Sequence, residues 1–184
     1  ATLIKAVRAY VKKPGKMLDL GSGCGVVGVV LNLEGLVEAP LYASDLSQQA
    51  VDCMKENATS HQCSVVAKCG SLFEPWENET FDYIVNDISG VAVEVAKLSP
   101  WFDHVPCDSG ADGAVLVVQV IQKASAHLKN GGRFFFPVIS LSNVDKILTE
   151  ARRNFSNVEC LCREQWPLPQ EMQKHLETLK RLRD

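Results

Sequence analysis

The sequence predicts an α/β fold with a doubly wound, mostly parallel sheet and helices on both of its faces. Short apolar segments typical of buried strands alternate with amphipathic segments at helical spacing, and the connections between them are short. A glycine-rich turn, Gly21–Gly28, joins the first strand to the next helix. In such sheets ligands bind beyond the carboxyl ends of the strands, so we expect the functional site there.

Composition limits the class of protein. The chain has 184 residues, 46% of them apolar, and a net charge of −3. This length suits one domain spanning 1–184, with an N-terminal helix (1–14), a cofactor-binding core (15–140) and a C-terminal sheet edge and helix (141–184). No apolar run approaches the roughly 20 residues of a membrane span, and the net charge argues against a broadly basic nucleic-acid-binding surface.

The cysteines favour a reducing compartment. There are seven of them, an odd number, and no pair has C-x-x-C spacing. Neither a zinc site nor a disulfide framework is therefore expected, and we predict a cytoplasmic protein without a metal. Because the sequence begins at Ala1 rather than Met, it is compatible with a piece of a longer chain.

The elements can be placed along the chain from periodicity and from turn signals. Ser47 is a good N-cap for the helix that follows it, and Pro14-Gly15 ends the first helix. In chain order we expect a helix over 3–11, a strand over 16–20, a helix over 26–33, a strand over 41–44, a helix over 47–58, strands over 64–69 and 81–86, a helix over 113–128, a strand over 133–138, a helix over 143–154, a strand over 158–163 and a helix over 172–182.

Three segments are less regular. Segment 113–128 is Val-rich, which favours a strand, but its length and spacing predict a helix. Segment 87–112 is long and rich in helix breakers, which indicates a functional loop or a short element of its own. Near the C-terminus, prolines 167 and 169 prevent a regular seventh strand, so that strand is rearranged or lies beyond the sequence.

The glycine loop begins directly after the first strand. Gly23, Gly25 and Gly28 satisfy the G-x-G-x-x-G pattern of dinucleotide-binding folds. That fingerprint normally begins at the strand end, which would put the bulky Val26 at its third glycine. The carboxylate of Asp19 would also repel a pyrophosphate and attract a cationic ligand.

Asp19-x-Gly21-x-Gly23-x-Gly25 resembles motif I of the class I S-adenosylmethionine-dependent methyltransferases. The resemblance implies a Rossmann-like fold in which these glycines line the cofactor. It also implies that Asp19 faces the cofactor ammonium.

The resemblance continues along the chain. It implies that Asp45, at the end of the second strand, binds both ribose hydroxyls. Segment 70–75 resembles the G-D-L-F-E-P stretch of the same family, with Ser71 where an acid reaches the adenine amino group. Leu46 and Leu72 would lie on the two faces of the adenine ring.

The fourth strand is similar to that of methyltransferases of the small-domain and release-factor glutamine type, which ends F-D-x-I-V-x-(N/D)-P-P-(Y/F). Segment 81–90 reads FDYIVNDISG, so Asp87 falls on the Asn/Asp position and Gly90 on the aromatic one. Both prolines are missing. The resemblance implies that Asp87 stands at the point of methyl transfer, as a hydrogen-bond acceptor or general base.

Further along, residues 109–113 resemble the G-x-D-G turn of the same family. Between the two motifs, Trp101, Phe102 and His104 are candidates for substrate binding. Trp101 or Phe102 would stack on the acceptor, and His104 would accept a proton. The alternative is that both aromatics anchor the loop to the core and His104 lies at the surface.

The leading hypothesis is a methyltransferase that uses S-adenosylmethionine, releases S-adenosylhomocysteine, and acts on an unidentified protein side chain, RNA or small molecule. Two alternatives stay open: an inactive cofactor-binding or scaffold module, and an NAD(P)-dependent oxidoreductase. Five basic residues within 1–16 form an RNA-facing patch or, more simply, a solvated helix face. We expect no membrane partner and no strong nucleic-acid signature, and the last helix could support an oligomer.

Overall fold

The computed structural model describes residues 2–88, 90–98 and 109–183, with side chains up to residue 180. It divides into two compact units. We call residues 1–87, 123–137 and 159–163 the sheet unit, and residues 88–122, 138–158 and 164–184 the helical unit. The expectation of a single functional domain stays a prediction.

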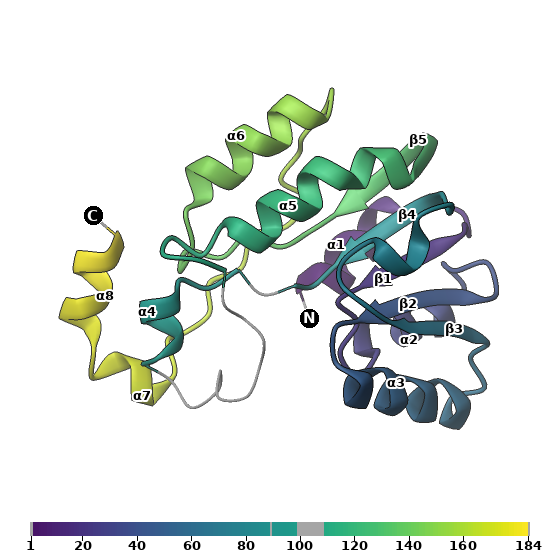
Figure 1. The fold of residues 1–184 in the computed structure, drawn as a ribbon, viewed down its shortest axis with the longest axis horizontal. Coiled ribbons are helices and arrows are strands. Elements are labelled where there is room, and N and C mark those ends of the chain that lie inside the picture. The colour runs from purple at the N-terminus through teal and green to yellow at the C-terminus, as the bar shows by residue number, and fades with distance from the viewer. Residues whose placement is uncertain (1, 89, 99–108, 184) are drawn as a thin grey trace. The chain divides into compact units, whose positions relative to one another are not determined.

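The sheet unit is built on five parallel strands in the order β3-β2-β1-β4-β5 (Figure 1). The strand order reverses between β1 and β4, which is the switch point where ligands bind in such sheets. The strands are β1 (Met17–Leu20), β2 (Leu41–Asp45), β3 (Val65–Cys69), β4 (Phe81–Asn86) and β5 (Leu128–Phe135). The predicted α/β class with a parallel sheet is confirmed.

Three helices belong to the sheet unit: α1 (Thr2–Tyr10), α2 (Val26–Leu33) and α3 (Gln48–Ser60). Helix α2 packs against β1 and β2, and it also contacts α1 and α3. Their apolar residues form one core with the sheet, in which Val7, Leu31 and Met54 are fully buried. Ser47 caps α3 as predicted, because its hydroxyl accepts a hydrogen bond from the amide of Ala50 at 3.3 Å.

Strand β2 shows the alternation of a pleated sheet. Leu41 and Ala43 belong to the core formed with the helices. Tyr42 instead makes edge-to-face contacts with Trp76 and Phe81, at centroid distances of 5.6 and 5.5 Å. Trp76 lies in the short helix η1 (Glu74–Trp76) that follows β3. The face of β2 that carries Tyr42 is therefore covered by an aromatic cluster.

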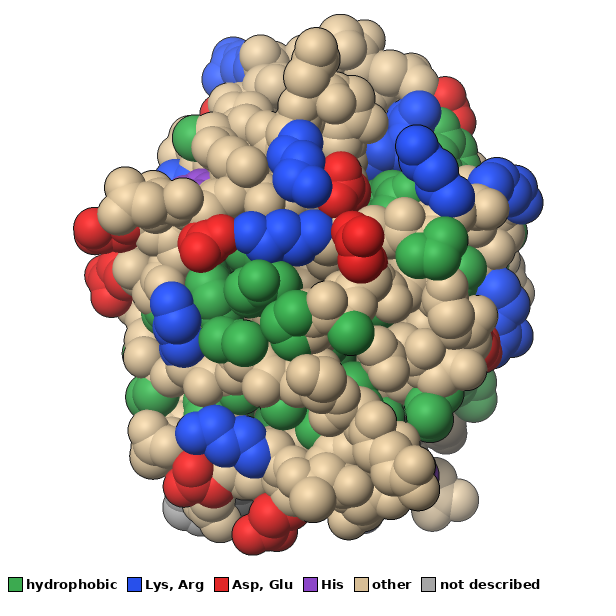
Figure 2. Space-filling view, turned by 90° about the vertical axis from the view of Figure 1, so that its right-hand side faces the viewer, with side chains coloured by type: hydrophobic (Ala, Val, Ile, Leu, Met, Phe, Trp, Pro, Cys, Tyr) green, Lys and Arg blue, Asp and Glu red, His purple; other side chains and the backbone are tan. Residues whose placement is uncertain are grey.

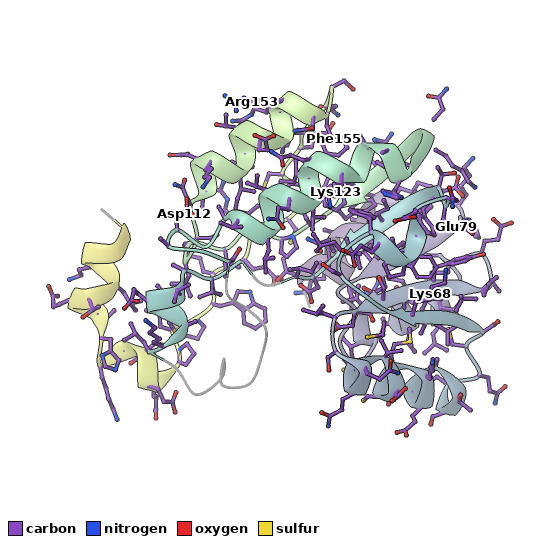
Figure 3. The ribbon with its side chains drawn as sticks, viewed as in Figure 1. Lys68, Glu79, Asp112, Lys123, Arg153 and Phe155 are labelled. Carbon is purple, nitrogen blue, oxygen red and sulfur yellow. The ribbon has the colours of Figure 1, made fainter. Side chains whose placement is uncertain are left out.

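The helical unit contains α4 (Val93–Ala96), most of α5 (Val115–Ala124), α6 (Val144–Asn154), α7 (Gln170–Gln173) and α8 (Leu176–Arg183). Val91, Ala92, Val95 and Met172 form a small buried cluster within it. The carboxylate of Asp112, labelled before α5 in Figure 3, lies 2.8 Å from the ammonium of Lys146. The short helix η3 (Ser125–His127) follows α5 and belongs to the sheet unit.

Several predicted boundaries are wrong. Segment 158–163 is not a strand, because it makes no ladder with a described strand and none of its residues is buried. The predicted helix over 172–182 is interrupted at 174–175 and forms α7 and α8. Strand β5 begins five residues early and contains Gly131-Gly132, with an irregular register opposite β4. The irregular segment 87–112 does contain a short helix, α4, as expected.

None of the helices in the described part of the chain is long and apolar enough to cross a membrane.

Candidate functional site

The register of the sheet brings three strand ends to one level. Leu20 in β1 pairs with Ser44 in β2 and with Asn86 in β4. The residues that follow these three positions therefore emerge at the same edge of the sheet. We call this edge of the sheet the carboxyl edge. It carries Gly21, Asp45 and Asp87, as the sequence predicts.

Asp19 lies just below this edge and is completely buried. Its Oδ2 accepts a hydrogen bond from the amide of Gly28 at 2.8 Å, whereas its Oδ1 has no partner among the described residues. Burial, together with the nearby charges of Asp87 and Asp45, raises the pKa of Asp19 to about 7. A buried carboxylate oxygen without a donor is unfavourable unless a cationic or hydrogen-bonding ligand meets it.

The absence of a side chain at Gly28 allows the hydrogen bond from its amide to Asp19. A Cβ at this position would lie 2.8 Å from Asp19 Oδ2 and 2.8 Å from Leu41 Cδ2. Only glycine therefore lets helix α2 approach the sheet closely enough for its amide to reach Asp19. The sequence signals Gly28 only through the alternative dinucleotide pattern, and its structural role was not predicted.

Asp45 joins the glycine loop to the end of β2. Its Oδ2 accepts from the amide of Gly23 and its Oδ1 from the amide of Ser47, both at 2.9 Å. Each carboxylate oxygen has a second lone pair, so Asp45 can accept two more hydrogen bonds from a ligand. Its half-buried position at the carboxyl edge leaves room for such donors.

The middle of the glycine loop faces open space. Gly23 has a φ of +53°, and a Cβ built on it would meet nothing within 4 Å. Since no atom of the described residues fills this space, the requirement for glycine comes from the backbone conformation and from access to the loop. The loop returns toward the sheet through its backbone, because the amides of Gly21 and Ser22 both donate to the carbonyl of Ser44, at 2.9 and 3.0 Å.

Two leucines and a serine flank the loop at the ends of β2 and β3. Leu46 is 60% exposed, which is unusual for a large apolar side chain next to a sheet. Leu72 has a φ of +48°, a strained conformation for a residue with a Cβ. Ser71 precedes it and is half-buried. An exposed leucine and a strained leucine that follow the carboxyl ends of β2 and β3 are features of a ligand site.

Asp87 is accessible at the end of β4, but the surrounding protein removes part of its hydration and raises its pKa. Asp19, Asp45 and Asp87 together give the carboxyl edge a negative potential. No group of three or more His, Cys, Asp or Glu in the described ranges could hold a metal ion. The negative potential of the three acids favours a cationic ligand at this edge.

The predicted substrate residues Trp101, Phe102 and His104 lie outside the described residues. Gly90, at the position of the family's aromatic residue, is buried. A Cβ there would lie 2.7 Å from the carbonyl oxygen of Gly113 and 2.9 Å from Val117 Cγ2. No aromatic side chain fits at this position, so stacking on an acceptor would have to come from another residue.

The basic N-terminal segment is extensively paired. Arg8 contacts Glu34, and Lys16 contacts Glu79, which Figure 3 labels before β4. In the centre of the face drawn in Figure 2, Lys and Arg side chains lie next to Asp and Glu side chains, while several Lys and Arg side chains gather at its upper right. These pairs favour the solvated helix face over the RNA-facing alternative.

Comparison with known proteins agrees with this geometry. Residues 1–87 match the family model described as the methyltransferase small domain. This match covers 87 of the 184 residues of the chain. The predicted resemblance to class I methyltransferases of the small-domain and release-factor glutamine group is thereby confirmed.

Relatives extend the similarity beyond the small domain. The chain is 26% identical over 146 residues to the ribosomal protein L11 methyltransferase of Staphylococcus saprophyticus, covering 76% of this chain and 43% of that protein. It is 30% identical over 124 residues to the release factor glutamine methyltransferase of Geobacter sulfurreducens, covering 63% and 42% respectively. The chain therefore spans about two-fifths of the length of these curated relatives.

Solved structures support the fold. The 16S rRNA N2 methyltransferase of T. thermophilus, solved in complex with AdoMet and guanosine, superposes with a TM-score of 0.65 at 20% identity. The alignment covers 88% of this chain and 39% of that one. The chain therefore shares the α/β fold of that methyltransferase.

Proposed function

We propose that the chain is the catalytic domain of an S-adenosylmethionine-dependent methyltransferase. The observation that carries this proposal is the unpartnered Oδ1 of Asp19, fully buried beneath a glycine loop that faces open space. A ligand with an ammonium group would supply the missing donor and a balancing charge.

The residues of the carboxyl edge fit this cofactor. Asp19 would bind its ammonium, and Gly21, Gly23 and Gly25 would follow its amino-acid portion. Asp45 has two oxygens that each retain an acceptor site for the ribose hydroxyls. When bound, the cofactor supplies a methyl group already activated on a sulfonium. The same residues would hold S-adenosylhomocysteine after transfer.

The adenine ring would lie between Leu46 and Leu72. The exposure of Leu46 and the positive φ of Leu72 support this assignment, because burial against a flat ring would compensate both. Ser71 offers a neutral hydroxyl to the adenine amino group, which is a weaker partner than an acid.

Asp87 is the residue that we assign to the point of transfer. Its position after β4 and its raised pKa favour a group that accepts a hydrogen bond or a proton from the acceptor. The named relatives modify a ribosomal protein, a release factor glutamine and ribosomal RNA. The acceptor of this chain is accordingly proposed as a protein side chain, an RNA or a small molecule, with Trp101, Phe102 and His104 as candidate contacts.

Calorimetric titration tests the cofactor assignment. The wild-type chain is titrated with S-adenosylmethionine, with S-adenosylhomocysteine and with NAD. We expect micromolar binding of the first two and none of NAD, and a large loss in Asp45→Asn. Binding of NAD alone would instead support the oxidoreductase alternative, and no binding of any of the three would overturn the proposal.

A second candidate is a module that binds the cofactor without transferring the methyl group. The packing around Gly90 favours it, since this position has no room for the aromatic residue of the resembling family. Incubation with labelled S-adenosylmethionine and a cell extract separates the two. Label in any extract component would exclude the module, whereas cofactor binding without label transfer in extracts of several growth conditions would favour it.

The compartment and the oligomeric state of the protein are also proposals. We propose a reducing compartment, the cytoplasm, on the basis of the cysteine content. An oligomer through the C-terminal helix is likewise a proposal, and the solution mass of the chain tests it.

A further inference from the structure

Trp76 is a residue that the sequence gives no reason to connect with the site. It lies in η1, is 1% exposed, and belongs to the sheet unit. Its indole nitrogen donates a hydrogen bond to the hydroxyl of Ser44 at 2.9 Å. An indole N–H is a donor only, so this buried group depends on Ser44 for its acceptor.

Ser44 in turn holds the glycine loop. Its carbonyl oxygen accepts hydrogen bonds from the amides of Gly21, at 2.9 Å, and Ser22, at 3.0 Å. The carbonyl of Ser22 then accepts from the amide of Gly25 at 2.8 Å. One buried residue, 1% exposed, therefore links the indole on one side to the first turn of the loop on the other.

The indole itself is fixed on several sides. Tyr42 and Phe81 contact it edge to face, with interplanar angles of 79° and 88°. The ammonium of Lys68, labelled on β3 in Figure 3, lies 4.2 Å from the centre of its ring and 2.8 Å from the carbonyl of Pro75. These contacts leave the ring little freedom to rotate, so the direction of its N–H is set by the surrounding packing.

We infer that Trp76 is a positioning residue of the cofactor site, which sets the conformation of the glycine loop through its hydrogen bond to Ser44. This inference rests on the proposed function for its effect on binding. Its structural part, the ordering of the loop amides, is independent of any ligand.

Trp76→Phe removes the N–H while keeping an aromatic ring in the cluster. Ser44→Ala removes the acceptor from the other side and leaves the Ser44 carbonyl in place. Trp166→Phe is the matched control, because Trp166 is 72% exposed and belongs to the helical unit. The double variant Trp76→Phe/Ser44→Ala completes a double-mutant cycle.

Affinity for S-adenosylmethionine is the first readout. We expect each single variant to bind about fivefold to tenfold more weakly, the double variant to bind no more weakly than either, and the control to match wild type. Additive losses, or a lowered melting temperature with affinity within twofold of wild type, would overturn the inference and leave the proposed function standing.

Hydrogen exchange of the ligand-free protein is the second readout. We expect the amides of Gly21 and Ser22 to exchange at least about tenfold faster in Trp76→Phe than in wild type, while the amides of β5 keep their rates. Unchanged exchange at these two amides would refute the positioning role even if no cofactor bound. If Trp76→Phe does not fold, Ser44→Ala tests the same hydrogen bond.

Discussion

Two glycine-rich turns in the described part of the chain have similar compositions and opposite surroundings. The loop that contains Gly23 follows Asp19 of β1, and the turn before α5 contains Gly113 next to Asp112. Both glycines have a positive φ, +53° and +70°. A Cβ on Gly23 would meet nothing within 4 Å, whereas one on Gly113 would lie 2.6 Å from the amide nitrogen of Ala92.

The acids next to the two turns also differ, both in their hydrogen-bond partners and in the direction of their pKa shift. Asp112 accepts from the amide of Ala114 at 3.2 Å and pairs with Lys146, and these partners lower its pKa. Asp19 is buried with one oxygen unpartnered, and its pKa is raised. Glycine content alone therefore does not identify a ligand site. Open space at Gly23 and a buried carboxyl oxygen without a partner among the described residues distinguish the loop that we propose as the cofactor site from the turn before α5.

Gly113→Ala should have the largest effect on stability. The new methyl group would meet the backbone of Ala92 and Val91 in a conformation that disfavours a side chain. We expect the free energy of unfolding to fall by about 4 kcal/mol, combining overpacking with backbone strain. Urea denaturation measures it, and a loss below about 1 kcal/mol would show that the turn tolerates a Cβ.

Asp19→Asn should raise stability at alkaline pH. Folding raises the pKa of Asp19 from about 4 to about 7, so the folded chain holds its proton more tightly and stability falls as the pH rises through this range. The amide removes this loss while its oxygen can still accept from Gly28. At pH 8 we expect a gain on the order of 3 kcal/mol, which falls to about 1 kcal/mol at pH 5 and vanishes below the unfolded pKa of about 4. Denaturation at both pH values checks this, and a variant less stable than wild type at pH 8 would contradict it.

Gly23→Ala should separate stability from binding. Only the backbone conformation opposes the new methyl group, so the stability cost should be about 1 kcal/mol. Binding of S-adenosylmethionine should weaken about tenfold or more, since the methyl group enters the space assigned to the cofactor. Wild-type affinity in this variant would place the ligand elsewhere.

Asp112→Asn should have the smallest effect and the opposite dependence on pH. Its pKa is lowered in the folded chain, so its contribution is present above the unfolded value of about 4 and is lost as the pH falls through the lower folded value. The pair with Lys146 is largely solvated, so we expect a loss below about 1 kcal/mol at pH 7. A loss that grew toward acid pH would contradict this sign.

The sheet unit shows how far local pattern determines structure. Strand β4 and helix α2 begin and end at the predicted residues, because apolar runs bounded by turn residues specify buried elements. The C-terminal region follows such patterns less closely. Segment 158–163 has strand-like alternation but makes no ladder with a described strand, and pairing depends on a partner that local sequence does not reveal.

The sequence predicts the acids and glycines of the candidate site, but it does not predict the residues that hold them in place. Asp19 is the last residue but one of β1, Asp45 ends β2 and Asp87 follows β4, positions that the sequence alone identifies. Gly28 and Ser44 act through backbone amides and a carbonyl, which carry no sequence signature. Trp76 reaches Ser44 only because β3 returns beside β2, a tertiary contact.

The most direct test of the distinction between the two turns is the affinity of Asp19→Asn for S-adenosylmethionine, with Asp112→Asn as the matched control. Both variants replace one carboxylate by an amide. We expect Asp19→Asn to lose about 30-fold or more in affinity, because an ion pair to the cofactor ammonium is replaced by a neutral contact. Asp112→Asn should bind within twofold of wild type. Wild-type affinity in Asp19→Asn would contradict the assignment of the glycine loop as the cofactor site.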